Sequence, residues 1–233
     1  MHIFSKSPLV IYIEDFLTSH ERAHLQDLAK GNFKHSAVAG SSSKGNIHSV
    51  RTSQSTSIQR DDVVRCIEAR ALAFQGLDAE DAYTSSRLEP VQLVKYAATE
   101  HFHYHTDWFT DPAHAAASLG GNRQSSFFAY VKADNVTSGG TNFPLLDAPG
   151  RRAEDGGEGW WCRAGFLDCD AEYEDGVTFR PVEGNAVFWA NLDEDGQGDG
   201  RTLHAGLPLV AGEKIGMNIW TRQAALPAEV RGK

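Results

Sequence analysis

The sequence predicts a mostly β fold with flanking helices, in which N-terminal helices pack on a β-sandwich or jelly roll. Two observations lead to this prediction. Helical hydrophobic spacing is confined to the first third of the chain, whereas beyond Arg87 the chain consists of short apolar runs bounded by Gly, Pro, Asp and Asn. Such a density of short runs, without helical patterns between them, is typical of stacked antiparallel sheets.

The N-terminal third begins with a predicted strand over residues 9–13, which form a short apolar run. The sequence Thr18-Ser-His-Glu21 has the form of a capping box and predicts a helix that continues to about Lys30. Residues 31–51 are rich in Gly, Ser and Lys, and we expect them to form a mobile loop.

A second helix is predicted from Asp61 or Asp62 to about Phe74. Its apolar residues recur at helical spacing, namely Val63, Val64, Ile67, Ala71 and Leu72. Cys66 lies on this helix, and we expect it to be buried as a small apolar residue.

The remaining predicted strands follow Arg87 and cover residues 91–96, 102–107, 127–131, 177–179, 186–190 and 215–221. We expect a single domain over residues 1–233, because this length can bury one sizeable core. Residues 1–87 would form a helical N-terminal support and residues 88–222 the β core. Residues 146–175, rich in Gly, Asp and Glu, would form a surface insertion.

The composition is that of a soluble globular protein, with 41% hydrophobic and 23% charged residues. The net charge of -9 would repel phosphates, so we do not expect a nucleic-acid partner. The longest apolar run near the start, residues 8–13, is too short to cross a bilayer and does not resemble a signal peptide. We therefore expect a monomer that does not insert into a membrane.

Three cysteines are present, Cys66, Cys162 and Cys169, and none belongs to a CxxC pair. A structural zinc site is therefore not predicted. Cys162 and Cys169 are close enough in sequence to form a disulfide in an oxidising compartment, and free thiols are the equally weighted alternative.

The segment HFHYHTDWF carries His101, His103, His105 and Asp107 at every second position. Alternate side chains of a strand share one face, so we expect these four polar groups on the same side. Imidazole and carboxylate are ligands that suit iron, zinc and manganese. Two His and one carboxylate, with open positions opposite, form the arrangement found in non-heme Fe(II) oxygenases.

An H-x-D pair alone is weak evidence and requires a distant third ligand. His204 is the candidate, because it follows the apolar run 186–190 and stands just before another predicted strand. Lys214 follows ten residues later at the start of that strand and could neutralise the distal carboxylate of a dicarboxylic co-substrate.

These residues, in this order and spacing, resemble the prolyl 4-hydroxylase branch of the Fe(II)/2-oxoglutarate-dependent dioxygenases. The resemblance extends over most of the chain. Its most specific parts are Tyr96, His105-Thr-Asp107, Gly139-Gly-Thr-Asn-Phe-Pro144, Thr202-Leu-His-Ala-Gly206, Lys214 and Trp220. It implies a double-stranded β-helix, the cupin-like form of the jelly roll, with the catalytic site inside it.

The resemblance also implies roles for single residues. Iron(II) would be bound by His105, Asp107 and His204. Lys214 would pair with the distal carboxylate of 2-oxoglutarate. Three further residues would lie beside that co-substrate, and four would line the substrate cavity: Tyr96, Thr141 and Tyr130 in the first group, and Trp220, His103, Trp108 and Asn218 in the second. Dioxygen and ascorbate, the usual reductant, complete the implied set of cofactors.

The implied reaction converts 2-oxoglutarate to succinate and carbon dioxide and hydroxylates an unactivated C–H bond. The substrate is expected to be peptidyl proline; a free amino acid or a natural-product intermediate is the alternative. A non-catalytic metal-binding β-sandwich is the third hypothesis, which Lys214 disfavours because a mere scaffold does not need it. The compartment stays open: the endoplasmic reticulum if a signal or anchor has been removed, the cytoplasm if the chain is complete.

Overall fold

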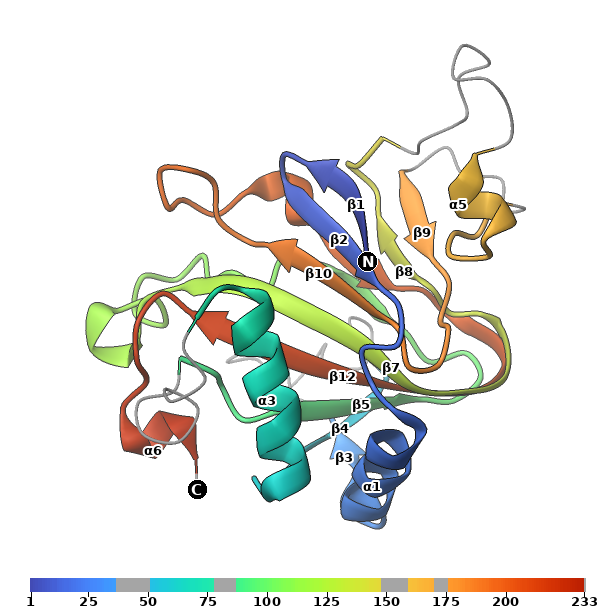
Figure 1. Cartoon of the computed structure of the whole chain (residues 1–233), viewed down its shortest axis with the longest axis horizontal. Coiled ribbons are helices and arrows are strands. Elements are labelled where there is room, and N and C mark those ends of the chain that lie inside the picture. The colour runs from blue at the N-terminus through green and yellow to red at the C-terminus, as the bar shows by residue number, and fades with distance from the viewer. Residues whose placement is uncertain (37–50, 78–86, 148–158, 170–175, 233) are drawn as a thin grey trace.

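The computed structural model describes residues 1–36, 51–77, 87–147, 159–169 and 176–232. Two antiparallel sheets stack on each other, and helices cover the other face of the larger sheet (Figure 1). This is the mostly β jelly roll with packed helices that the sequence predicts.

The larger sheet has eight strands in the order β1-β2-β10-β7-β12-β5-β4-β3. Their bounds are β1 (His2–Lys6), β2 (Leu9–Ile13), β3 (Lys34–His35), β4 (Gln54–Ser57), β5 (Gln92–Tyr96), β7 (Arg123–Ser138), β10 (Ala186–Ala190) and β12 (Leu209–Arg222). All neighbouring strands pair antiparallel. The first 87 residues thus contribute four strands to this sheet as well as helices.

The smaller sheet has four strands in the order β6-β11-β8-β9. Their bounds are β6 (Phe102–His105), β8 (Thr141–Phe143), β9 (Val177–Phe179) and β11 (His204–Gly206). Antiparallel pairing of β6 with β11 sets His105 directly opposite His204, although 99 positions separate them in sequence (204 minus 105). Two of the three candidate metal ligands therefore meet through strand pairing, and the third, Asp107, follows two residues after His105.

The two long helices begin where the sequence predicts. Helix α1 (Ser19–Ala29) starts with the complete capping box of Thr18 and Glu21. Helix α3 (Asp62–Phe74) is capped by Asp61, whose carboxylate accepts the N–H of Val64 at 2.9 Å. Short helical turns are η1 (Ala117–Leu119), α5 (Trp160–Arg163), η3 (Gly200–Thr202) and α6 (Ala228–Arg231). Among the described helices, none has the length and apolar character needed to span a bilayer.

The expectation that Cys66 is buried is wrong, because its side chain is exposed. Helix α3 turns a different stripe toward the core, formed by Val64, Ile67, Glu68, Ala71 and Leu72. An apolar residue type near an amphipathic pattern does not by itself lie on the buried face.

Strand alternation divides the core of the protein between the two faces of the larger sheet. Phe127, Ala129, Ile215 and Met217 belong to the cluster that packs against α1 and α3. Their sequence neighbours point to the opposite face, where residues such as Phe128 and Tyr130 pack toward the smaller sheet. The second face is the one that carries the candidate site.

Part of the expected loop 31–51 and of the expected insertion 146–175 falls outside the described residues, at positions 37–50, 148–158 and 170–175. The described part of the insertion is not wholly on the surface. Phe166 and Leu167 are buried in the cluster between the sheets. Cys162 and Cys169 form a disulfide that closes this short loop, which decides between the two alternatives for these cysteines.

The disulfide can be tested by mass spectrometry. Trypsin cleaves after Arg163 and so separates Cys162 from Cys169, leaving the bond between the cysteines as the only link between the two peptides. We expect a linked pair before reduction and two separate peptides after it. Complete alkylation of both thiols in unreduced protein from an oxidising host would contradict the bond.

Candidate active site

Three side chains form a cluster with the composition of a metal site. One ligand atom from each of His105, Asp107 and His204 lies within 4.8 Å of the others. The Nε2 atom of His105 is 3.8 Å from Oδ1 of Asp107, and Nε2 of His204 is 3.8 Å from Oδ2. These separations leave room for a cation in contact with all three groups, and the donor set fits iron(II).

Main-chain hydrogen bonds orient both imidazoles. Nδ1 of His105 lies 2.8 Å from the carbonyl oxygen of His103, and Nδ1 of His204 lies 2.9 Å from that of Thr202. A carbonyl can only accept, so each Nδ1 carries a proton, and in the neutral form of each ring Nε2 keeps a free lone pair. Both lone pairs are on the nitrogens that face Asp107.

The electrostatics of the cluster favour the forms that bind a metal. Burial raises the pKa of the Asp107 carboxyl, but His204, His105, Arg123 and a hydrogen bond from Ser126 outweigh burial, so the net pKa is lowered. Burial and the neighbouring His204 lower the pKa of His105. At neutral pH the carboxyl is therefore ionised and the His105 ring is neutral, as metal ligation requires.

The expected alternation of polar side chains does not hold through β6. Two steps along β11, from His204 to Gly206, oppose three steps along β6, from His105 to Phe102, so β6 contains a bulge. As a result Phe102 stacks on His105, with ring centroids 3.6 Å apart. His103 is exposed and is not among the residues that line the described cleft; its carbonyl, rather than its imidazole, serves the site.

Lys214 lies in the interior next to this cluster and is fully buried. Its ammonium lies 4.4 Å from the ring centroid of Tyr96 and donates to the carbonyl of Gly139. No carboxylate among the described residues pairs with it. A buried cation without a counter-charge is costly, and burial lowers the Lys214 pKa to about 7. The residues therefore fit a co-substrate that brings its own carboxylate.

Of the three residues expected near the co-substrate, Tyr96 lies beside Lys214, and Tyr130 and Thr141 contact each other. Tyr96 pairs directly with Lys214 across β5 and β12, and burial raises its pKa to about 12, so its hydroxyl stays protonated. Tyr130 and Thr141 are buried together, with their hydroxyl oxygens 2.9 Å apart. Tyr96 and Thr141 line the inner pocket beside His105, Asp107 and His204, whereas Tyr130 supports Thr141 from behind.

A larger cleft of about 660 Å³ opens in front of the cluster. Trp108 and Trp220 line it, and Trp220 also reaches the inner pocket together with Asn218. The Trp108 indole N–H donates to the carbonyl of Asp199 at 3.2 Å, which fixes this wall of the cleft. Three of the four residues expected to line the substrate cavity thus border the described cavities, and His103 is the exception.

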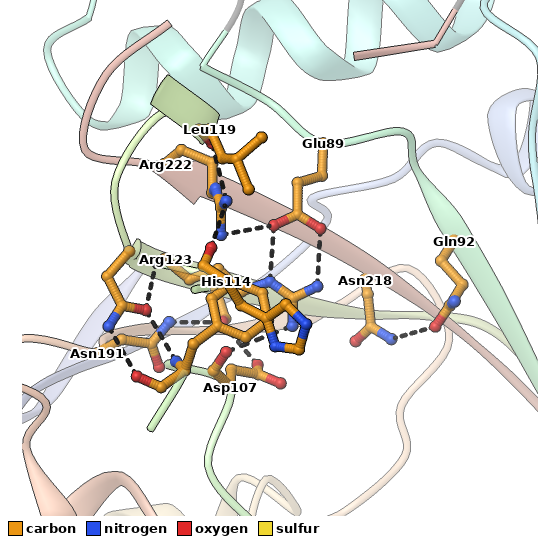
Figure 2. Close-up of polar contacts among 12 residues, drawn as sticks. Glu89, Gln92, Asp107, His114, Leu119, Arg123, Asn191, Asn218 and Arg222 are labelled. Atoms are coloured by element: carbon orange, nitrogen blue, oxygen red, sulfur yellow. Dashed lines mark hydrogen bonds and ion pairs between the residues drawn. The ribbon is translucent and has the colours of Figure 1, made fainter. Parts of the chain in front are cut away.

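The sequence reasoning missed an arginine pair behind Asp107. Arg123 donates two hydrogen bonds to Glu89, at 2.7 and 2.8 Å, and one to the carbonyl of Asp107 at 3.3 Å (Figure 2). Its guanidinium lies 3.8 Å from the Trp220 ring centroid. Arg222, also near Glu89, donates to the carbonyls of His114 and Leu119 and so fixes the loop before β7. The sequence contains only a weak signal for this pair, because polar residues stand beside the apolar run 127–131.

Arg51 stands at the end of the expected mobile loop 31–51, but the structure gives it a defined position beside the site. It is buried, and its guanidinium lies 4.2 Å from the centroid of the Phe102 ring that stacks on His105. Its Nε donates to Ser53 at 3.0 Å. Arg51 and Phe102 therefore support one imidazole of the cluster from the side of the cleft.

Comparisons with known proteins agree with this geometry. A model of the 2OG-Fe(II) oxygenase superfamily matches residues 91–222. Prolyl 4-hydroxylase 1 of Arabidopsis thaliana is 29% identical over 96% of this chain and 72% of its own length. Prolyl 4-hydroxylase 2 of the same plant is 32% identical over 93% of this chain and 68% of its own length.

A solved structure has the same fold. The viral collagen prolyl hydroxylase of Paramecium Bursaria Chlorella virus-1, in its 2OG complex, aligns with a TM-score of 0.61 and 22% identity. The alignment covers 91% of this chain and 95% of the viral one.

We predict that replacing His105, Asp107 or His204 by Ala abolishes iron(II) binding, because two remaining ligands cannot hold an open site. Anaerobic titration of the metal-free protein with iron(II) measures this. His103→Ala is the matched control in the same strand and should bind iron like the wild type. Equal loss of binding in the control, or retained binding in His204→Ala, would contradict the assignment.

A second prediction follows from the low pKa of Lys214. Binding of a carboxylate requires the charged ammonium, so 2-oxoglutarate binding should take up a proton above the Lys214 pKa of about 7. Its affinity should therefore be nearly constant below that pH and fall above it, by up to about tenfold per pH unit. Anaerobic titration of the iron-loaded protein between about pH 6 and pH 9 measures the profile.

Lys214→Arg is the matched control, because a guanidinium stays charged over this range. It should bind more weakly but with a flat profile. A wild-type profile that is also flat, or one that falls toward low pH, would show that Lys214 is not the group that titrates.

Proposed function

Because this chain belongs to the 2OG-Fe(II) oxygenase superfamily, we propose that it hydroxylates proline residues within peptides. The chain is a 2-oxoglutarate-dependent dioxygenase that uses iron(II), 2-oxoglutarate and O₂, and ascorbate is the typical reductant of such enzymes. When bound, the iron and the co-substrate supply the oxidation that inserts oxygen into a C–H bond, with succinate and carbon dioxide as products.

One observation carries the proposal: the inner pocket of the His105, Asp107 and His204 cluster is lined by Tyr96. Against the ring of Tyr96 lies Lys214, a buried lysine that has no carboxylate partner among the described residues. A metal site alone does not need this lysine, whereas a dicarboxylic co-substrate does. A dicarboxylic co-substrate needs a binding group at each end, and the site offers both. A cation can bind the far carboxylate, and open positions on the metal can bind the near end.

The side chains around the pocket have separate roles in this proposal. His105, Asp107 and His204 hold the metal, and Lys214 with the Tyr96 hydroxyl binds the far carboxylate of the co-substrate. Thr141 lines the space between them. The apolar walls formed by Phe102, Phe128 and Trp220 exclude water from the reacting carbon.

The proposed substrate rests on the relatives and on the cleft. Relatives about 30% identical to this chain are named prolyl 4-hydroxylases. The cleft of about 660 Å³ is much larger than a proline ring and is lined by both polar and aromatic side chains, including Arg123 and Trp220, which suits a segment of peptide. We further propose that the chain acts as a monomer and does not insert into a membrane.

The substrate proposal is tested by product analysis. Iron-loaded protein is incubated with 2-oxoglutarate and a proline-containing peptide, and we expect succinate together with a peptide heavier by one oxygen atom on proline. Chromatography of the hydrolysed peptide against hydroxyproline isomers then identifies the position. The same peptide with Ala in place of proline, and the His204→Ala protein, are the controls.

Two outcomes would overturn the substrate proposal. Hydroxylation of free proline or another free amino acid, with peptides unchanged, would favour a small-molecule oxygenase. Succinate that forms at the same rate with and without the peptides would show that these peptides are not its substrate.

A further inference from the structure

We propose that Ser126 and Asn191 are positioning residues that fix Asp107 with Oδ1 as its iron-binding atom and thereby set the affinity for iron. The Ser126 hydroxyl lies 2.6 Å from Oδ2 of Asp107, and Nδ2 of Asn191 lies 2.9 Å from the Ser126 oxygen. Both side chains are completely buried. Asn191 and Asp107 approach this point from separate segments of the chain (Figure 2).

The direction of these hydrogen bonds follows from chemistry. The ionised Asp107 can only accept, so the single hydroxyl proton of Ser126 must point at Oδ2. The Ser126 oxygen then has only lone pairs left, so Asn191 must present its NH₂ group and not its carbonyl. The Asn191 carbonyl oxygen accordingly finds no donor among the described residues.

This arrangement distinguishes the two carboxylate oxygens of Asp107. Each oxygen lies 3.8 Å from one imidazole, Oδ1 from Nε2 of His105 and Oδ2 from Nε2 of His204. Oδ2 also accepts a short hydrogen bond from Ser126, whereas no described donor bonds to Oδ1, which keeps its lone pairs free for the metal. Without Ser126 the carboxylate could rotate about its last bond and present either oxygen or both. Groups that orient a metal ligand in this way typically change metal affinity by about 10–100-fold.

The fold keeps both residues in place independently of the metal. Ser126 pairs with Trp189 of β10 on one side and with Trp220 of β12 on the other, so it lies between two large side chains. The main chain of Asn191 donates to the carbonyl of Gln124 and accepts from Asp199, both at 2.9 Å. The pair is thus prearranged for Asp107 rather than assembled by iron.

The first experiment compares Ser126→Ala with Ser125→Ala by anaerobic titration of the metal-free proteins with iron(II). Ser125 is the matched control: it is also buried and donates a 2.6 Å hydrogen bond, but to Gln75 on the opposite face of β7. We expect about 10–100-fold weaker binding for Ser126→Ala and unchanged binding for Ser125→Ala. Ser126→Thr keeps the hydroxyl and should restore most of the affinity.

The second experiment tests whether Asn191 acts through Ser126. Asn191→Ala alone should weaken iron binding less than Ser126→Ala does, and the double variant should be no weaker than Ser126→Ala, because residues that act in series are not additive. The absorption spectrum of cobalt(II) bound at the metal site reports the coordination of the metal directly. This spectrum should change in Ser126→Ala but not in Ser125→Ala. Asn191→Ala tests the pair even if Ser126→Ala does not fold.

Three results would overturn the proposal. Iron affinity of Ser126→Ala or of Asn191→Ala equal to that of the wild type would show that the pair does not position Asp107. Equal weakening in Ser125→Ala would point to general destabilisation of β7. Additive losses in the double variant would show that Asn191 acts separately from Ser126.

Discussion

The antiparallel pairing of β7 with β12 is the constraint on which the rest of the structure depends. Their paired register runs from Leu209 opposite Ser138 to Arg222 opposite Arg123. Because side chains alternate between faces, one face of this pair buries apolar residues against α1 and α3. The other face carries Trp220, which lines the inner pocket, Ser126, which donates to Asp107, and Lys214, which lies against Tyr96. A shift of one residue would exchange the two faces and lose both the core and the site.

Several charged side chains are buried at the site, and the neighbours of each explain how its charge is accommodated. The ionised Asp107 carboxylate is stabilised by the nearby Arg123 and by a hydrogen bond from Ser126, and it lies next to the imidazoles that would share the metal with it. Glu89 pairs with Arg123, which also stacks on Trp220. Lys214 is fully buried and has no carboxylate partner among the described residues, which fits a co-substrate that supplies the missing charge. Removing one partner of a buried ion pair destabilises a protein much more than removing one partner of an exposed pair.

Local sequence patterns predicted the helices and strands that depend on interactions between residues close in sequence. The capping box at Thr18, the helix beginning after Asp61 and the apolar strands β2, β9 and β10 agree with the structure. Strands β1, β3, β4, β8 and β11 were not predicted, because they are short or polar and become strands only by pairing with a neighbour. Strand β3 lies within residues 31–51, which were expected to form a loop. Strand β7 extends beyond the predicted run 127–131 for the same reason.

The sequence by itself determined the candidate chemistry of the site: the motifs around His105, Asp107, His204 and Lys214 contain the residue types that suit iron and a dicarboxylate. Only the tertiary structure decided which neighbours serve them. A bulge in β6 turned His103 outward and put Phe102 against His105. Strand pairing and a loop brought Ser126, Asn191, Arg123 and Glu89 to Asp107. Such residues form no motif, because their partners are distant in sequence and are set by the register of strands.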